Sequence, residues 1–147
     1  MTTPDDKLFG LISASRQGVL ATVAKDGRPQ MSNVLYVWDA VERIARISTT
    51  ANRAKARNLA RDPRAALHVS GTHFWQYAVA DGDVTLSEVA AEPGDEATGE
   101  LLDLHTVHYG ALDEVQFYPQ MIAARRLVVR LHVRRVYGVA LDTPPGG

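Results

Sequence analysis

The chain has 147 residues, 46% of them hydrophobic, and a formal net charge of −1, which suits one globular domain and excludes a disordered or globally basic chain. It has no cysteine, which excludes disulfides, thiolate nucleophiles and cysteine zinc sites, and a cytoplasmic protein is expected. No signal-peptide pattern opens the sequence, and no run approaches the roughly 20 apolar residues of a membrane span. Neither nucleic acid nor a membrane is expected as a partner.

The first half of the chain predicts one helix and several strands. Asp5 is expected to cap a helix whose apolar face is Leu8, Leu11 and Ile12. Asp26-Gly27 is the strongest short signal for a hairpin turn. Strands rich in β-branched residues are predicted over residues 18–24, 30–38, 41–49 and 64–71, with a helix over residues 52–61 that ends before Pro63.

The strand over residues 30–38 alternates without a purely apolar face. One face carries Gln30, Ser32, Val34, Tyr36 and Trp38. The other carries Met31, Asn33, Leu35 and Val37. Because a strand in a simple two-sided sheet separates apolar from polar residues, one face is expected to meet a ligand or a partner.

The second half predicts more strands around a helical segment. Residues 74–88 form two strands or one long bent strand. Helices are expected over residues 93–110 and 113–126, the second kinked at Pro119, followed by strands over 126–133 and 134–141 and a frayed tail over 142–147. Many short strands with hairpin turns favour an antiparallel barrel or sandwich over a βαβ fold, with a single domain over residues 1–147 and its core at about residues 8–139.

Two cations occupy an unusual place in the helix over residues 52–61. With Asn52 as the N-cap, Arg53 and Lys55 fall in the first turn, where the helix dipole favours acids. Free N–H groups at a helix start bind anions, so cations there become favourable once a phosphate is present. Hydroxyl groups precede the helix at Ser48, Thr49 and Thr50. The pattern therefore indicates a phosphate-bearing ligand at the junction of strand and helix.

The spacing alone leaves a second interpretation open. Arg53, Arg57 and Arg61 recur every four residues and could form a solvated stripe opposite a buried side of Ala56, Leu59 and Ala60. A nucleic-acid patch is disfavoured, because no aromatic residues are interleaved with the basic ones.

Other candidate residues carry weaker signals. His105 and His108 have metal-ligand spacing without a third ligand, and His68 between apolar neighbours is typical of a structural histidine, so no metal site is assigned. Arg125 and Arg126 could support a phosphate or could be edge charges. No G-x-S-x-G or G-x-G-x-x-G motif is present, which argues against a serine hydrolase and a Rossmann nicotinamide site.

Four segments in order resemble one family. They are "GVLATVAKDGRPQMSNVLYVWD", "STTANRAKARNLARDPRAALHV" with its R-x-K-x-x-N core, "WQYAVADGDVTL" and "RRLVVRLHVRRVYGV". Together they are similar to the flavin/deazaflavin oxidoreductases of the split β-barrel class, related to pyridoxamine 5'-phosphate oxidase, and most similar to the actinobacterial branch that uses coenzyme F420. The resemblance covers about residues 8–139 and implies a mainly β, six-stranded antiparallel split barrel with flanking helices. The chain lacks the Arg- and Trp-rich C-terminal segment of the vitamin oxidase itself.

The resemblance also implies a homodimer with cofactor sites at the interface. Arg53 and Lys55 would hold the cofactor phosphate with help from Ser48, Thr50 and Asn58. Gln30, Ser32 and Asn33 would lie beside the ring. Trp75 and Tyr77 would approach it from the other subunit. No catalytic acid or base is assigned.

The implied activity is transfer of a hydride from reduced F420 to a small, flat, conjugated acceptor, near Trp38, Trp75 and Tyr77. Two alternatives remain open: an FMN-binding flavoprotein of the same fold, and a protein that binds or stores F420 without turnover.

Overall fold

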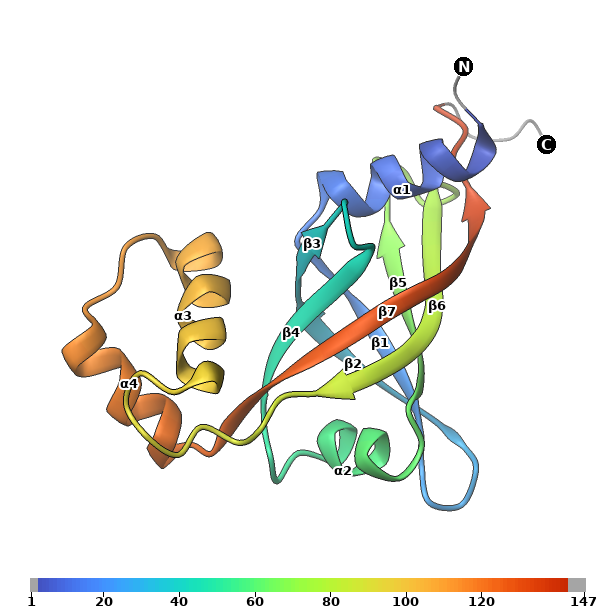
Figure 1. Ribbon diagram of the computed structural model, residues 1–147. Helices are drawn as coiled ribbons and strands as arrows, with labels where there is room; N and C mark the ends of the chain where they lie inside the picture. The colour runs from blue at the N-terminus through green and yellow to red at the C-terminus, as the bar shows by residue number, and fades with distance from the viewer. Residues whose placement is uncertain (1–2, 143–147) are drawn as a thin grey trace.

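The computed structural model describes residues 3–142 of the chain. A single antiparallel sheet of seven strands, in the order β2-β1-β5-β6-β7-β4-β3, curls into a half-barrel (Figure 1). The strands are β1 (Gln17–Val23), β2 (Pro29–Leu35), β3 (Val37–Asp39), β4 (Ile44–Thr50), β5 (Arg64–Ser70), β6 (Tyr77–Leu86) and β7 (Arg126–Val139). The helices are α1 (Pro4–Ala14), α2 (Ala54–Arg61), α3 (Glu96–Tyr109) and α4 (Glu114–Ala123). No helix in the described part is long and apolar enough to cross a bilayer.

The inside of the half-barrel forms the main core. Alternate side chains of β1, β5, β6 and β7 point inward, and Leu20, Leu67 and Leu131 are fully buried there. Helix α1 covers one end of the barrel and α2 lies across the other (Figure 1). Leu8 and Ile12 of α1 and Leu59 of α2 belong to the same core cluster. Both helices therefore present an apolar face to the barrel and a polar face to solvent.

Helices α3 and α4 lie beside the barrel, against β4 and β7 (Figure 1). A second core cluster fills this contact, with Leu101, Leu104, Phe117 and Val128 among its members. Polar bonds anchor the same contact: Glu100 of α3 accepts from Arg46 Nε at 3.2 Å and from Arg130 Nε at 2.9 Å. The α3–α4 pair is thus held against one face of the sheet by both packing and ion pairs.

Several sequence-based predictions are confirmed, among them a mainly β antiparallel barrel with flanking helices and the strand over residues 64–71, which is β5. Residues 74–88 contain one long strand, β6, with a register shift between Asp81 and Gly82. A Cβ atom at Gly82 would lie 1.9 Å from the backbone oxygen of His132, so only glycine fits this close approach. The tail expected to fray lies outside the described residues from 143 onward.

Other predictions were wrong in detail. Thr3, not Asp5, caps α1, because its hydroxyl accepts from the N–H of Asp6 in a capping box. The sheet has seven strands rather than the six that the resemblance implies. The segment expected as one strand over 30–38 divides into β2 and β3 at Tyr36. The two expected closing strands are one continuous strand, β7.

Candidate functional site

The first backbone N–H groups of helix α2 have no side-chain hydrogen-bond acceptor. Arg53, not Asn52, is the N-cap residue, and no side chain accepts from the first N–H groups. Asn52 does not cap the helix because its Oδ1 instead accepts from the hydroxyl of Thr50 at 2.8 Å. The first turn contains no acid. This helix start therefore offers N–H donors and positive partial charge to an external anion.

A cleft of about 290 Å³ opens beside this helix start. Its walls come from β2, β4, the start of β7 and α3. Five of the predicted site residues line it: Asn33, Ser48, Thr50, Arg53 and Lys55. The cleft also takes in side chains that the resemblance did not supply, which are Arg46, Leu104, His105, His108, Tyr109 and Arg126.

Lys55 and Arg53 are the cations at the α2 side of the cleft. Lys55 Nζ donates to Ser32 Oγ of β2 at 3.3 Å, which brings a sixth predicted residue, Ser32, to the edge of the cleft. Burial, and then the charge of Arg53, lower the pKa of Lys55 below its ordinary value of 10.5. No carboxylate of the described residues lies within 4.0 Å of either cation. Their positive charge is therefore available to a ligand.

Asn58 and Gln30 are hydrogen-bonded to each other and do not face the cleft. The amide of buried Asn58 donates to Gln30 Oε1 and to Thr22 Oγ1, the latter at 3.0 Å, and its own oxygen accepts from Arg61 Nη2 at 2.9 Å. Neither Asn58 nor Gln30 lines the cleft. In this structure the pair joins α2 to the β1–β2 hairpin, so their part in ligand binding stays a prediction.

The α3 side of the cleft holds a polar cluster of its own. Ser48 Oγ accepts from Arg126 Nη1 at 3.0 Å and lies 3.0 Å from His105 Nε2. Burial, followed by the charges of Arg126 and His108, lowers the pKa of His105 below its ordinary value, so its neutral form is favoured. From the sequence alone, we considered His105 and His108 only as metal ligands. Nothing local in the sequence signals that α3 folds back over β4 and β7.

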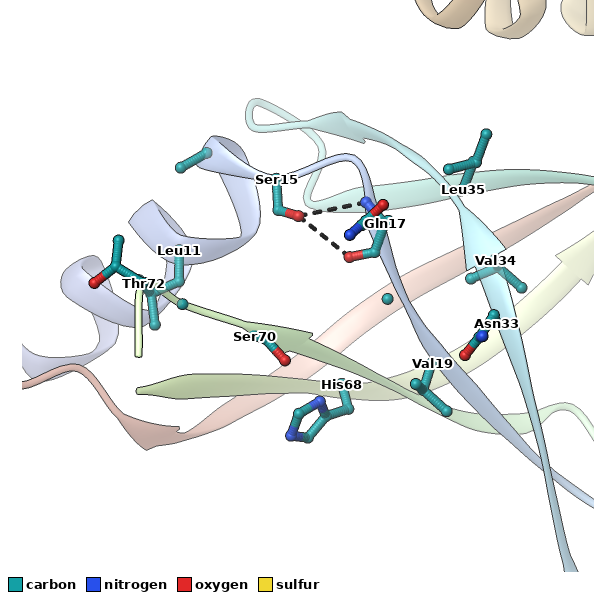
Figure 2. A pocket seen from close by; sticks show the side chains of 13 residues that line it. Leu11, Ser15, Gln17, Val19, Asn33, Val34, Leu35, His68, Ser70 and Thr72 are labelled. Carbon is teal, nitrogen blue, oxygen red and sulfur yellow. Dashed lines mark hydrogen bonds between the residues drawn. The ribbon is translucent and has the colours of Figure 1, made fainter. Parts of the chain in front are cut away.

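A larger hollow of about 690 Å³ lies on the outer side of β1, β2 and β5 (Figure 2). Asn33, Val34 and Leu35 line both this hollow and the cleft, so strand β2 separates the two. His68, which sequence analysis treated as a structural residue, is half-buried on its wall. The His68 ring stacks on Tyr77 with centroids 5.3 Å apart and planes inclined by 10°.

The aromatic residues expected around the ring are not gathered at the cleft. Trp38 stacks on Phe9 of α1 at 5.9 Å, and Trp75 packs edge-on against Phe74 at 4.8 Å in the loop before β6. Trp75 remains 54% exposed. Among residues 3–142, no group of three or more potential ligands could hold a metal ion, His105 and His108 included.

Comparison with known proteins gives the family. The family described as pyridoxamine 5'-phosphate oxidase matches residues 4–140. Among solved structures, a protein named F420 reductase is 26% identical, with a TM-score of 0.66 over 93% of this chain and 98% of that one. A conserved hypothetical protein from Mycobacterium tuberculosis is 24% identical, with a TM-score of 0.70 over 100% of this chain and 94% of that one.

An FMN-binding protein from Nostoc punctiforme, described as related to pyridoxamine 5'-phosphate oxidase, shares the fold as well. It is 18% identical, with a TM-score of 0.61 over 88% of this chain and 77% of that one. The family match spans nearly the whole described chain, and the fold agrees with it. The chain therefore belongs to the pyridoxamine 5'-phosphate oxidase family.

Proposed function

We propose that this protein binds coenzyme F420 in the cleft beside α2 and serves as an F420-dependent reductase of small conjugated acceptors. The observation that carries the proposal is the start of α2, where uncapped N–H groups, Arg53 and Lys55 face the cleft and no carboxylate of residues 3–142 lies within 4.0 Å of either cation. Without a bound anion, each cation at a helix start destabilises the helix by roughly 0.3–1 kcal/mol. A bound phosphate reverses the sign of that term.

The residues present fit the phosphate that F420 and FMN share. Arg53 supplies a planar fork of donors and Lys55 a point charge, while Ser48 and Thr50 line the same cleft with hydroxyl groups. Asn33 lines the cleft from β2, where it can donate to a polar edge of the cofactor ring. Ser32 holds the Lys55 ammonium in place at 3.3 Å. These contacts bind and orient the cofactor; no residue of the chain has to take part in bond making.

The choice of F420 over FMN rests on the difference in sequence identity between two solved structures. The protein named F420 reductase matches at 26% identity, whereas the FMN-binding relative matches at 18%. Reduced F420, when bound, supplies a hydride to the acceptor. The acceptor would approach the cofactor from the open side of the cleft.

A homodimer is part of the proposal. Met31 and Leu35 of β2 stay 65% and 43% exposed, and the hollow of about 690 Å³ lies on the same outer face. A second copy over this face would remove that apolar surface from water. It would also bring Trp75 and Tyr77 of the second copy toward the ring, since neither residue lines the cleft of its own copy.

The test is a fluorescence titration of the purified protein with F420 and, separately, with FMN. We expect tighter binding of F420 and a loss of about tenfold to 100-fold in Lys55→Gln, as removal of a charge-assisted bond costs roughly 1.5–3 kcal/mol. Arg57→Gln is the matched control, since Arg57 is exposed on the same helix and does not line the cleft.

Three results would count against the proposal in different ways. Tight binding of FMN alone would assign the protein to flavin chemistry. Equal losses in Lys55→Gln and Arg57→Gln would mean that the cations act through general charge only. Tight F420 binding with no acceptor reduced faster than in free solution would indicate a binding or storage protein.

A further inference from the structure

We propose that Arg126, Ser48 and His105 form a second anion subsite in the cleft, which takes the carboxylate of an acidic acceptor. The inference rests on the proposed function in one respect, because it names the class of acceptor for the same site. It uses Arg126 and His105, which the proposed phosphate site does not use, and it shares Ser48 with that site.

The three residues come from three separate elements. Ser48 is on β4, Arg126 begins β7 and His105 is on α3, yet both the guanidinium and the imidazole reach the same hydroxyl at 3.0 Å. All three line the cleft and are half-buried. The fold therefore gathers one cation, one hydroxyl and one imidazole in the part of the cleft that β4, β7 and α3 line, where Arg126 pairs with Thr50 just before the α2 helix start.

Arg126 has spare capacity for a ligand. Its bond to Ser48 uses Nη1, and a guanidinium carries five N–H donors in all. No carboxylate of the described residues lies within 4.0 Å of it, whereas the neighbouring cleft residue Arg46 pairs with both Glu100 and Asp39. Arg126 is thus a half-buried cation with no acidic partner among residues 3–142.

The charge of the cluster matches a single carboxylate. Arg126 contributes one permanent positive charge, and His105 is neutral around pH 7 because its pKa is lowered. A carboxylate has two oxygens, which can accept one bond from the guanidinium and one from the hydroxyl of Ser48. A phosphate is better served by Arg53 and Lys55, which supply two cations beside the helix N–H groups.

The pKa of His105 can report on anion binding at this subsite, because charged and polar groups surround its ring. Arg126 approaches it from β7, His108 from the next turn of α3, and Ser48 from β4. The Phe117 ring of α4 packs at 5.0 Å and the Tyr109 ring at 6.0 Å between centroids. Burial, and after it the charges of Arg126 and His108, lower the pKa of His105, and an anion bound at Arg126 would offset the charge contribution and raise the pKa.

The experiment follows the imidazole signals of His105 by NMR as a function of pH, with sodium benzoate as the probe and benzamide as its neutral isostere. It uses the full chain, unloaded and saturated with F420. The imidazole signals that disappear in His105→Gln are assigned to His105. We expect benzoate, but not benzamide, to raise the pKa of His105 in both forms.

Three variants locate the benzoate. Arg126→Gln should weaken benzoate binding at least about tenfold, as loss of a charge-assisted pair does, and Arg126→Lys should recover part of it. Lys55→Gln should leave benzoate affinity within about twofold while it weakens F420. Matching far-ultraviolet spectra and unfolding midpoints show that the variants are folded.

Several outcomes would overturn the subsite. They are equal responses to benzoate and benzamide, loss of benzoate binding in Lys55→Gln but not in Arg126→Gln, and benzoate binding to the unloaded form only, which would assign Arg126 to the cofactor. If F420 and FMN both fail to bind while benzoate still raises the pKa of His105, the proposed function fails and the subsite stands.

Discussion

Lys55 and Ser32 join the start of helix α2 to strand β2, with the ammonium nitrogen 3.3 Å from the hydroxyl oxygen. The contact fixes a long, otherwise mobile side chain at the edge of the cleft. Because the lysine is partly desolvated and lies near Arg53, its pKa is lowered from 10.5. The residue that is proposed to bind the phosphate therefore also loses its proton more readily than an ordinary lysine.

Cofactor affinity is expected to fall at alkaline pH earlier than an ordinary lysine would predict. A lowered pKa means that the unliganded protein loses the positive charge as pH rises through that lowered value, below 10.5. Lys55→Arg keeps its charge throughout, so its affinity should stay flat over the same range. Fluorescence titrations with F420 from pH about 7 to about 10 measure both. Identical pH profiles for the two proteins would remove Lys55 from the binding site.

Asn58→Ala should destabilise the protein more than it weakens cofactor binding. The change leaves a buried network without its centre, because Asn58 bonds Thr22, Gln30 and Arg61. We expect a loss of about 2 kcal/mol in the free energy of unfolding, measured with urea. Cofactor affinity should fall less than in Lys55→Gln. A larger fall than in Lys55→Gln would show that Asn58 turns toward the phosphate when cofactor binds.

The local pattern of the sequence predicts most of the strands and the helix that carries Lys55. The hairpin at Asp26-Gly27 forms, with Gly27 at a φ of 88°, and residues 64–71 form β5 as expected. These signals are local, since turn chemistry and two-residue alternation act over a few positions. Long-range contacts decide the rest. Tyr36 divides the expected strand because its N–H donates to the carbonyl of Arg16 and its hydroxyl to that of Ile12.

The α3 side of the site could not be predicted for the same reason. Arg126 and Ser48 are 78 positions apart in the chain, and His105 and Ser48 are 57 apart. Their meeting depends on the pairing of β4 with β7, which sets Thr50 opposite Arg126, and on the α3–α4 pair that folds over it. No periodicity within any one segment contains that information.

Glu100→Gln should loosen the α3–α4 pair from the sheet. Glu100 is 16% exposed and bonds both Arg46 and Arg130, so its neutralisation leaves Arg46 with Asp39 alone and Arg130 with the exposed Glu96 at 4.0 Å. We expect a loss of about 2 kcal/mol in the free energy of unfolding, and faster amide exchange in α3 than in β5. Asp103→Asn, an exposed change on the same helix, should stay within about 0.5 kcal/mol. Equal effects of the two changes would mean that packing alone holds the pair.

Tyr36→Phe should cost stability at neutral pH and remove one source of alkaline unfolding. The buried hydroxyl donates to the carbonyl of Ile12 at 2.6 Å, and its loss is expected to cost about 1 kcal/mol. Burial raises the pKa of Tyr36 to about 12 from 10.0. The unfolded chain therefore loses this proton first, so the contribution is complete below pH 10.0 and is lost as pH rises to about 12.

Urea unfolding of wild type and Tyr36→Phe between pH about 9 and about 12 tests this sign. The wild type should lose more stability over that range than the variant, so that their difference shrinks as pH rises. Tyr109→Phe is the control, because that side chain is 66% exposed and should change stability by less than about 0.5 kcal/mol. A difference that stays constant across the range would mean that the Tyr36 hydroxyl ionises as freely in the folded protein as in the unfolded chain.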